Sequence, residues 1–561
     1  MVLTGRFKEC CRRQKGGYEL FLQVSGHPGL CARRRVTIAR GTVAGVRTVA
    51  AELVTILYDE GIGHVFVSPG MHSTAIRDSL AEAEAAGVPH PRPVFCAHEQ
   101  VAVMAAHGHH LASGAPQAAV VAVHEPQLNL GSAVHGAQRH RVPITVFSSA
   151  RGREPSTTVG KWASDPTRAR QLGTTARRAF QISRAEPTGV THVPLAPETL
   201  HEAAGHPTRR LPPPRPPAPD MGALEEMAEL LAKAEAPLIV AGRVGRNPGS
   251  VHHLANLAET VGAPVIDFRC QVNLPQRHLL NAATDGRDLL AAADAILMLD
   301  VSLPCVSGLG PLSAQAWLLQ IDMDCLSVDM PVWPYPIEVA VNAHTERALP
   351  LLQTLVASRL SGRRRQIEDR RARVEAQLQV KRETWRARAA STEPADLPDA
   401  VLAELDRSLP GDVLVLEEGV AGAGGALRQM ERPPGHFFRS TYSGPGWAVG
   451  AALGARLAQP AQPVVAICDQ AAFASGLPTA ALWSAQRADA PFLTVVLDRT
   501  LDVGIEDASE EDSDVIVAAR ASGAEAQMVS RPSDVAAAVE RLLATTRDGV
   551  CAVLDVRLPL A

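Results

Sequence analysis

The chain has 561 residues, of which 46% are apolar and only 4% aromatic, and its formal net charge is −4. The length allows about two to four domains. The small net charge gives no global attraction to nucleic acid or to an anionic membrane, and no apolar run is long enough to span a bilayer. Abundant alanine and valine with few aromatic residues favour packed layers of parallel strands and small-residue helices.

The nine cysteines are scattered, with no CxxC pair and no zinc-finger spacing to histidine. This usage is typical of reduced, mostly buried thiols, so we expect a cytoplasmic protein without a disulfide framework. Residues 1–45 are rich in arginine and lysine and contain no long apolar segment, which disfavours a secretory signal. We predict a basic flexible extension there, and a basic arm for nucleic acid is the alternative.

Periodic structure begins in residues 46–205. Apolar residues recur at helical spacing over residues 49–58, a short buried strand that ends in a turn is predicted over residues 64–70, and further strands are predicted at residues 118–123 and 143–147. Small-residue helices separate these strands. The pattern therefore predicts βαβ units and a parallel sheet covered on both faces.

Residues 206–222 are rich in proline and can form neither a helix nor a central strand, so we predict a stiff linker. A second α/β unit is predicted over residues 223–358. Its predicted strands lie at residues 237–241, 264–268, 295–300 and 317–322.

Residues 359–395 are dense in arginine and glutamate and predict a solvated helical linker with i,i+4 ion pairs; nucleic-acid binding is the alternative. A third α/β unit is predicted over residues 396–561, with strands at residues 413–416, 464–467 and 492–497. The predicted fold class is α/β, with three consecutive doubly wound parallel-sheet domains.

Between Val94 and Gly114, Glu99 follows an apolar run and begins a small-residue helix. The simplest interpretation is a glutamate that favours the helix macrodipole. The stretch also resembles the pyrimidine-binding half-site of thiamine-diphosphate (ThDP) enzymes of the acetolactate-synthase-like group. The resemblance implies that Glu99 contacts the cofactor's aminopyrimidine and activates it from a dry pocket. The expected apolar frame of that pocket is Val94, Phe95, Val101, Val103 and Met104.

Three successive α/β units resemble the layout of ThDP decarboxylases and carboligases, which have a pyrimidine, a central and a diphosphate domain. Residues 237–246, 272–275 and 329–333 of the second unit resemble the acetolactate-synthase-like subgroup. The resemblance implies action on a 2-oxo acid or a related acyl donor. It also implies at least a homodimer, or a homotetramer, in which Glu99 of one chain faces Asp469 of another.

Further cofactor contacts follow from the same resemblance. Gly70 ends the turn after the first strand, and Asn129 matches a family asparagine that lines the site, although a helix cap is the alternative for it. The turn at residues 443–450 resembles the family turn that supports the cofactor. Its expected contacts are Gly444, Pro445 and Gly446, and an ordinary Gly/Pro turn that opens a helix is the alternative.

The metal motif departs from the family pattern. The family holds Mg²⁺ with the aspartate of a Gly-Asp-Gly turn and with an asparagine about 30 residues later. Here Asp469 is kept, but Cys468 and Gln470 replace both glycines, and Arg499 stands where the asparagine belongs. A guanidinium cannot ligate a cation, so Asp498 is the alternative metal ligand, while Gln470 and Arg499 are expected to contact the diphosphate.

Two hypotheses remain. The first is an active ThDP- and Mg²⁺-dependent lyase or carboligase. The second is a non-catalytic or regulatory subunit with a degenerate cofactor site, which pairs with an active paralogue in a hetero-oligomer. Nothing in the sequence supports FAD or a membrane, and a nucleic-acid partner, which we do not expect, has chiefly the basic residues 1–45 behind it. The histidines at 107, 109 and 110 are expected on a helix surface or an interface, and not in a zinc site.

Overall fold

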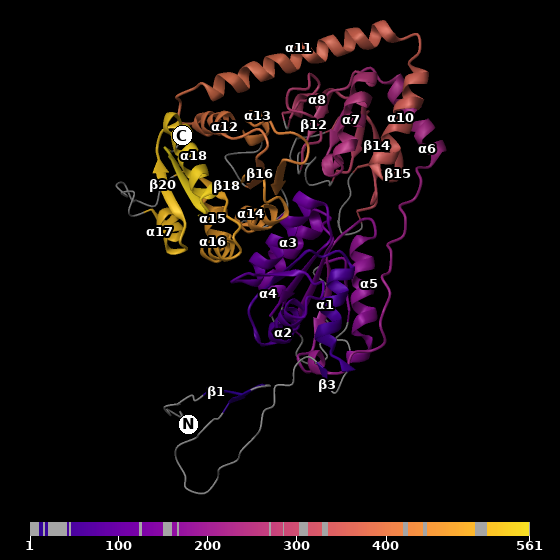
Figure 1. Ribbon diagram of the computed structural model, residues 1–561. Coiled ribbons are helices and arrows are strands. Elements are labelled where there is room, and N and C mark those ends of the chain that lie inside the picture. The colour runs from indigo at the N-terminus through magenta and orange to yellow at the C-terminus, as the bar shows by residue number, and fades with distance from the viewer. Residues whose placement is uncertain are drawn as a thin grey trace.

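The computed structural model describes residues 11–14, 17–20, 42–43, 46–122, 126–149, 160–164, 168–268, 271–283, 285–301, 312–327, 335–418, 425–440, 446–499 and 513–559. In the predicted extension and the first residues after it, the structure shows two short antiparallel pairs. These are β1 (Cys11–Gln14) with β2 (Gly17–Leu20), and β3 (Thr42–Val43) with β4 (Val46–Arg47). Three larger parallel sheets follow along the chain (Figure 1).

The first domain has a six-stranded sheet in the order β6-β5-β7-β8-β10-β9, and all its strand pairs are parallel. The strands are β5 (His64–Val67), β6 (Arg92–Phe95), β7 (Gln117–Val121), β8 (Ile144–Ser149), β9 (Trp162–Ala163) and β10 (Thr191–Leu195). The helices are α1 (Val49–Asp59), α2 (Met71–Ala85), α3 (Glu99–Ser113), α4 (Pro126–Arg139) and α5 (Leu172–Arg184), with 3₁₀ turns η1 (Ala169–Gln171) and η2 (Glu198–His201).

The proline-rich linker is held against the first domain. Arg184 donates from Nη2 to the carbonyl of Leu211 at 3.3 Å, and Gln181 donates to the carbonyl of Pro212 at 2.9 Å. Both side chains belong to α5. The fixed φ of proline and these two contacts together define the path of the linker toward the second domain.

The second domain has a five-stranded parallel sheet in the order β12-β11-β13-β14-β15. The strands are β11 (Pro237–Ala241), β12 (Val265–Asp267), β13 (Ala295–Leu299), β14 (Trp317–Asp322) and β15 (Val339–Asn342). The helices are α6 (Met221–Lys233), η3 (Val244–Arg246), α7 (Pro248–Val261), α8 (Arg287–Ala292) and α10 (Thr345–Arg359).

The predicted charged linker is a single helix, α11 (Arg364–Ala389), which runs along the second domain and reaches the third (Figure 1). The expected i,i+4 pairs are confirmed between Arg364 and Glu368 and between Arg371 and Glu375. Arg370 donates to the carbonyls at the ends of α6 and α7, at 2.6 and 2.9 Å. These contacts give the helix a fixed seat on the second domain.

The third domain has a six-stranded parallel sheet in the order β17-β16-β18-β19-β21-β20. The strands are β16 (Leu414–Glu418), β17 (Phe437–Ser440), β18 (Val464–Asp469), β19 (Leu493–Arg499), β20 (Glu525–Val529) and β21 (Ala552–Leu558). The helices are α12 (Leu397–Ser408), α13 (Gly425–Gln429), α14 (Trp447–Ala458), α15 (Gln470–Ser475), α16 (Pro478–Arg487), α17 (Asp514–Ala521) and α18 (Pro532–Arg547). The predicted three-domain α/β fold is confirmed.

The first and third domains share one apolar core, which we call the seam, formed where α3 packs on α14. Glycines make this contact possible. A side chain at Gly108 would overlap the carbonyl of Ala451, and one at Gly454 would overlap the carbonyl of Ala105. The two helix backbones therefore approach closely, because the residues between them have no bulk.

Four cysteines of the three domains, Cys96, Cys325, Cys468 and Cys551, are free and buried, as expected for reduced thiols. Among the helices of the described residues, none combines the length and the apolarity that a membrane crossing requires.

Candidate active site

Glu99 is the first residue of α3 and lies where the first and third domains meet. His98 caps the helix by accepting the N–H of Gln100, and its Nδ1 lies 3.6 Å from Oε2 of Glu99. The N–H of Ala97 donates to Oγ of Ser484 on α16 at 2.9 Å, which ties the start of α3 to the third domain. The helix dipole favours a carboxylate at this position.

The pocket around Glu99 is less dry than the sequence predicts. The Glu99 side chain is 18% exposed. Phe95 ends β6 at the edge of the sheet and is 42% exposed, so within a single chain it does not enclose Glu99. The other predicted frame residues are buried: Val94, Val101, Val103 and Met104.

Gly70 and Asn129 lie in the same domain as Glu99. Gly70 precedes α2, and a side chain there would overlap Cβ of Ala122, so glycine lets α2 start against the end of β7. Asn129 lies inside α4 and does not cap its start, which corrects that alternative. The side chain of Asn129 lies outside the described residues.

Asp469 ends β18 and caps α15 in the third domain. Its Oδ1 accepts the N–H of Ala472 at 2.7 Å, and Gln470 is the first residue of the helix. Cys468 is buried, and burial raises the pKa of its thiol well above the ordinary value. The departure from Gly-Asp-Gly thus produces a capped helix with an unreactive thiol beside it.

Glu418 is a site residue that the sequence reasoning missed. It ends β16, and its carboxylate accepts the N–H groups of Gly446 at 2.8 Å and Ala448 at 2.7 Å. Burial raises the pKa of Glu418 to about 7, although the backbone N–H donors oppose the shift. The only signal was an acidic pair, Glu417 and Glu418, at the end of a buried strand.

Gly446 precedes α14 with a φ of +104°, and a side chain there would overlap the backbone of Gly476. Glycine is required because both the left-handed φ and the close approach exclude a Cβ atom. The two neighbours predicted with it, Gly444 and Pro445, lie outside the described residues.

Asp498 forms an ion pair with Arg557. Its carboxylate lies 3.7 Å from Nε of Arg557, which also lies 3.6 Å from Asp555. Burial raises the pKa of Asp498 and raises the pKa of Asp555 to about 6. The carboxyl end of β19 is therefore paired internally with β21.

The predicted metal ligands do not assemble into a site within the part of the chain that is described. No group of three or more His, Cys, Asp or Glu side chains suited to a metal occurs there. Asp469 offers one oxygen, Asp498 faces Arg557, and the side chain of Arg499 lies outside the description. Mg²⁺ takes near-octahedral oxygen ligation, of which Asp469 can supply one oxygen, and Glu99 fits an aminopyrimidine.

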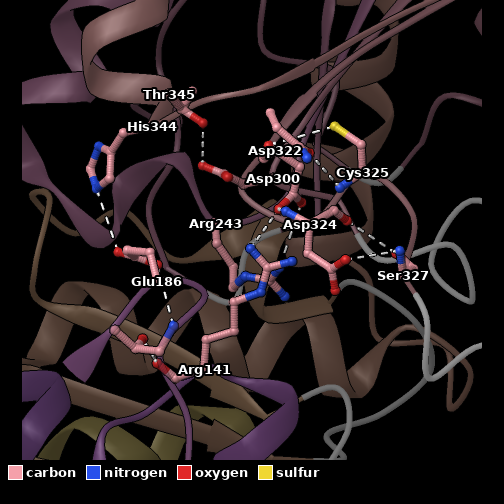
Figure 2. A network of polar contacts seen from close by, with 12 residues as sticks. Arg141, Glu186, Arg243, Asp300, Asp322, Asp324, Cys325, Ser327, His344 and Thr345 are labelled. Atoms are coloured by element: carbon pink, nitrogen blue, oxygen red, sulfur yellow. Dashed lines mark hydrogen bonds and ion pairs between the residues drawn. The ribbon is translucent and has the colours of Figure 1, made fainter. Parts of the chain in front are cut away.

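A second contact of the first domain, which we call the joint, lies at the carboxyl edge of the central sheet (Figure 2). Nη1 of Arg141 lies 2.5 Å from Oδ1 of Asp322, and Arg243 donates to the carbonyl of Arg139 at 3.3 Å. Glu186 of the first domain lies 3.7 Å from His344. The joint consists of Arg141, Glu186, Arg243, Asp322 and His344.

The joint occupies the edge at which doubly wound sheets usually take nucleotides. Gly242 follows β11 there, and a side chain at Gly242 would overlap the carbonyl of Asp300 after β13. The topological switch point of this sheet, between β11 and β13, is thus occupied by backbone and by the side chains of the joint. This arrangement gives no support for FAD.

These features define a class: a three-domain α/β protein whose first and third domains share a core and carry acidic side chains at their meeting edges. Residues 47–167, 224–349 and 421–556 match, in order, the N-terminal TPP binding domain, the central domain and the C-terminal TPP binding domain of thiamine pyrophosphate enzymes. The chain belongs to the thiamine pyrophosphate enzyme family.

Characterised relatives are distant. The chain is 24% identical over 367 residues to sulfoacetaldehyde acetyltransferase of Castellaniella defragrans, a match that covers 57% of this chain and 60% of the relative. It is 26% identical over 448 residues to the acetolactate synthase large subunit IlvG of Mycobacterium tuberculosis, covering 74% and 76%. The chain thus spans less than two thirds of the acetyltransferase.

Solved structures show the same fold. The ThDP-dependent 4-hydroxybenzoylformate decarboxylase of Rhodococcus jostii RHA1 superposes with a TM-score of 0.70 at 18% identity, covering 92% of this chain and 99% of that one. Benzoylformate decarboxylase of Polynucleobacter necessarius gives a TM-score of 0.70 at 15% identity, covering 91% and 99%. At these identities the likeness establishes the fold alone.

Proposed function

We propose that the protein is a ThDP-dependent lyase or carboligase that acts on a 2-oxo acid or a related acyl donor, with Glu99 as the activating carboxylate. The observation that carries the proposal is the position of Glu99 at the start of α3, against α16 of the diphosphate-binding domain. When bound, ThDP supplies a nucleophilic carbon and an electron sink for cleavage next to a carbonyl.

The residues of the chain then have distinct tasks. Glu99 holds a proton at the ring nitrogen of the aminopyrimidine, and the N-terminus of α3 supports its negative charge. Glu418 fixes Gly446 and the start of α14 beside the cofactor turn. The names of the relatives, an acetyltransferase, a synthase and two decarboxylases, support acyl chemistry without choosing the substrate.

We further propose a homodimer or homotetramer in which Glu99 of one chain faces Asp469 of another. Two exposed aromatic side chains support this assembly, Phe95 on β6 and Trp483 on α16, because these elements flank the contact between Ala97 and Ser484. An exposed aromatic pair beside a site is typical of a surface that a partner covers. Light scattering of the purified protein measures the assembly directly.

The decisive experiment is calorimetry of the purified protein with ThDP and Mg²⁺. We expect saturable binding, and no heat of binding at millimolar cofactor would refute the proposal for the homomer. Binding that appears only after a paralogous subunit is added would point to the hetero-oligomer instead.

Glu99→Gln tests the assigned role. We expect this variant to bind the cofactor and to lose about 10²-fold or more in kcat, which is the usual contribution of a positioned proton-transfer group. The matched control is Glu198→Gln, an exposed glutamate at the start of η2 in the same domain. Equal activity of the two variants would show that Glu99 has no catalytic task.

A further inference from the structure

Trp447, the first residue of α14, makes a polar contact across the seam. Its indole Nε1–H donates to Nδ1 of His107 on α3 at 3.0 Å, and both side chains are buried. Nε2 of His107 lies 3.0 Å from Nδ1 of His140, which follows α4. A buried chain of three side chains therefore links the diphosphate-binding domain to two helices of the pyrimidine-binding domain.

The two hydrogen bonds that join Trp447, His107 and His140 run in one donor-to-acceptor direction. An indole N–H can only donate, so Nδ1 of His107 accepts, and its proton sits on Nε2. That N–H in turn donates to Nδ1 of His140. Burial lowers the pKa of His107 well below its ordinary value, and burial with the charge of Arg243 lowers the pKa of His140 to about 3. Both rings are neutral, which the direction of the chain requires.

Residues 446–448 are held from two domains at once. Glu418, on the third domain's own sheet, accepts the N–H groups of Gly446 and Ala448. His107, from the first domain, accepts the side-chain N–H of Trp447 between them. These three residues belong to the segment 443–450 that is expected to support the cofactor.

We infer that His107 is a positioning residue that fixes the start of α14, and with it the cofactor-binding turn, relative to the helix that begins with Glu99. His107 lies about two turns along α3 from Glu99. One helix thereby presents the activating carboxylate and orients the turn that receives the cofactor. The inference rests on the proposed function for its consequence in catalysis, but the contact itself does not depend on it.

Small-residue packing alone would not give this precision. Gly108 and Gly454 let the two backbones touch, and Gly450 accommodates the side chain of Met104, but these apolar contacts depend less on angle than a hydrogen bond does. A hydrogen bond in a dry interior depends strongly on distance and angle. The bond from Trp447 to His107 therefore sets the rotation of α14 at its first residue.

His109 provides a matched control on the same helix. It is also buried, but its Nε2 lies 3.1 Å from Nδ1 of His64 and its Nδ1 lies 3.2 Å from Oγ of Ser113, all within the first domain. A substitution at His109 removes a buried histidine and its hydrogen bonds without touching the contact with Trp447.

The experiment compares Trp447→Phe, His107→Leu, His107→Gln and His109→Leu by ThDP calorimetry and by hydrogen–deuterium exchange of the apoprotein. We expect Trp447→Phe and His107→Leu to weaken ThDP binding about tenfold and to speed amide exchange in residues 446–450, because one buried partner is left unpaired. His107→Gln keeps an acceptor and a donor and should restore affinity to within about threefold of the wild type. His109→Leu should leave both measurements near wild type.

Wild-type affinity and exchange in Trp447→Phe would overturn the inference, and so would equal losses in His109→Leu and His107→Leu. If His107→Leu does not fold, the result for Trp447→Phe tests the inference by itself. This variant keeps the His107 imidazole and an aromatic side chain at position 447, and it removes only the indole N–H donor. If the wild-type protein binds no ThDP, the proposed function fails, and the exchange of residues 446–450 still tests the positioning role.

Discussion

The pyrimidine-binding domain contacts its two neighbours by opposite means. At the seam it meets the diphosphate-binding domain through glycine, alanine and a neutral hydrogen-bond chain. At the joint it meets the central domain through charged and polar side chains, since Arg141 pairs with the buried Asp322 and Glu186 lies beside His344. Two consecutive residues serve the two contacts, because His140 belongs to the seam and Arg141 to the joint. The comparison indicates that the seam derives its stability from close packing and the joint from charge.

The largest expected effect is at the joint. Arg141→Met removes one partner of the pair and leaves the buried Asp322 with the backbone N–H of Asp324 and, as the cation, the more distant Arg243 at 3.9 Å. Breaking a buried pair in this way costs about 3–5 kcal/mol in the free energy of unfolding. Urea unfolding measures the loss. Lys233→Met breaks an exposed pair with Glu229 and should cost less than about 1 kcal/mol. A similar small loss at Arg141 would show that the joint does not depend on charge.

The seam should respond to volume and not to charge. Gly108→Ala places a methyl group against the carbonyl of Ala451, and overpacking of this kind costs about 1–3 kcal/mol. Gly131→Ala is the control, because that glycine lies in α4 with open space around it. There alanine should stabilise by about 0.5–1 kcal/mol, through helix propensity. Opposite signs for the two variants in thermal unfolding support the packed seam, and equal signs contradict it.

The seam and the joint should lose their contributions to stability at different pH values. Burial keeps the folded-state pKa values of His107 and His140 below the unfolded value of 6.5, so their contribution to stability is complete above pH 6.5 and is lost as the pH falls. At the joint, burial opposes ionisation of Glu186, but the hydrogen bond from His344 and the charge of Arg246 still lower its pKa from 4.5 to about 2. Its contribution is therefore lost only below pH 4.5.

Urea unfolding between pH 7.5 and 5.5 tests this order. Each buried neutral histidine costs up to about 1.4 kcal/mol per pH unit while the unfolded chain takes up a proton. His140→Gln should therefore reduce the slope of stability against pH by about one proton. His201→Gln, at an exposed position, should leave the slope unchanged. An unchanged slope in His140→Gln would mean that the ring takes up its proton over the same pH range in the folded and in the unfolded protein.

Local patterns predicted the fold well, and contacts between distant segments account for what was missed. Short buried runs between small-residue helices predicted three parallel sheets, and charge spacing predicted α11 with its ion pairs. Glu418 was missed because its two donors, Gly446 and Ala448 at the start of α14, lie 28 and 30 positions later in the sequence. The metal prediction for Asp498 did not anticipate Arg557, which only the pairing of β19 with β21 brings alongside.

The contacts that α11 makes near its two ends fix the number of residues between them. Arg370 is seated on the ends of α6 and α7, and Trp385 is buried in the core of the diphosphate-binding domain. Each residue of an α-helix turns the following face by about 100° and advances it by about 1.5 Å. Inserting or deleting a single residue between these two seats would turn one of them away from its domain. The number of residues in α11 therefore determines the distance and the relative orientation of the second and third domains.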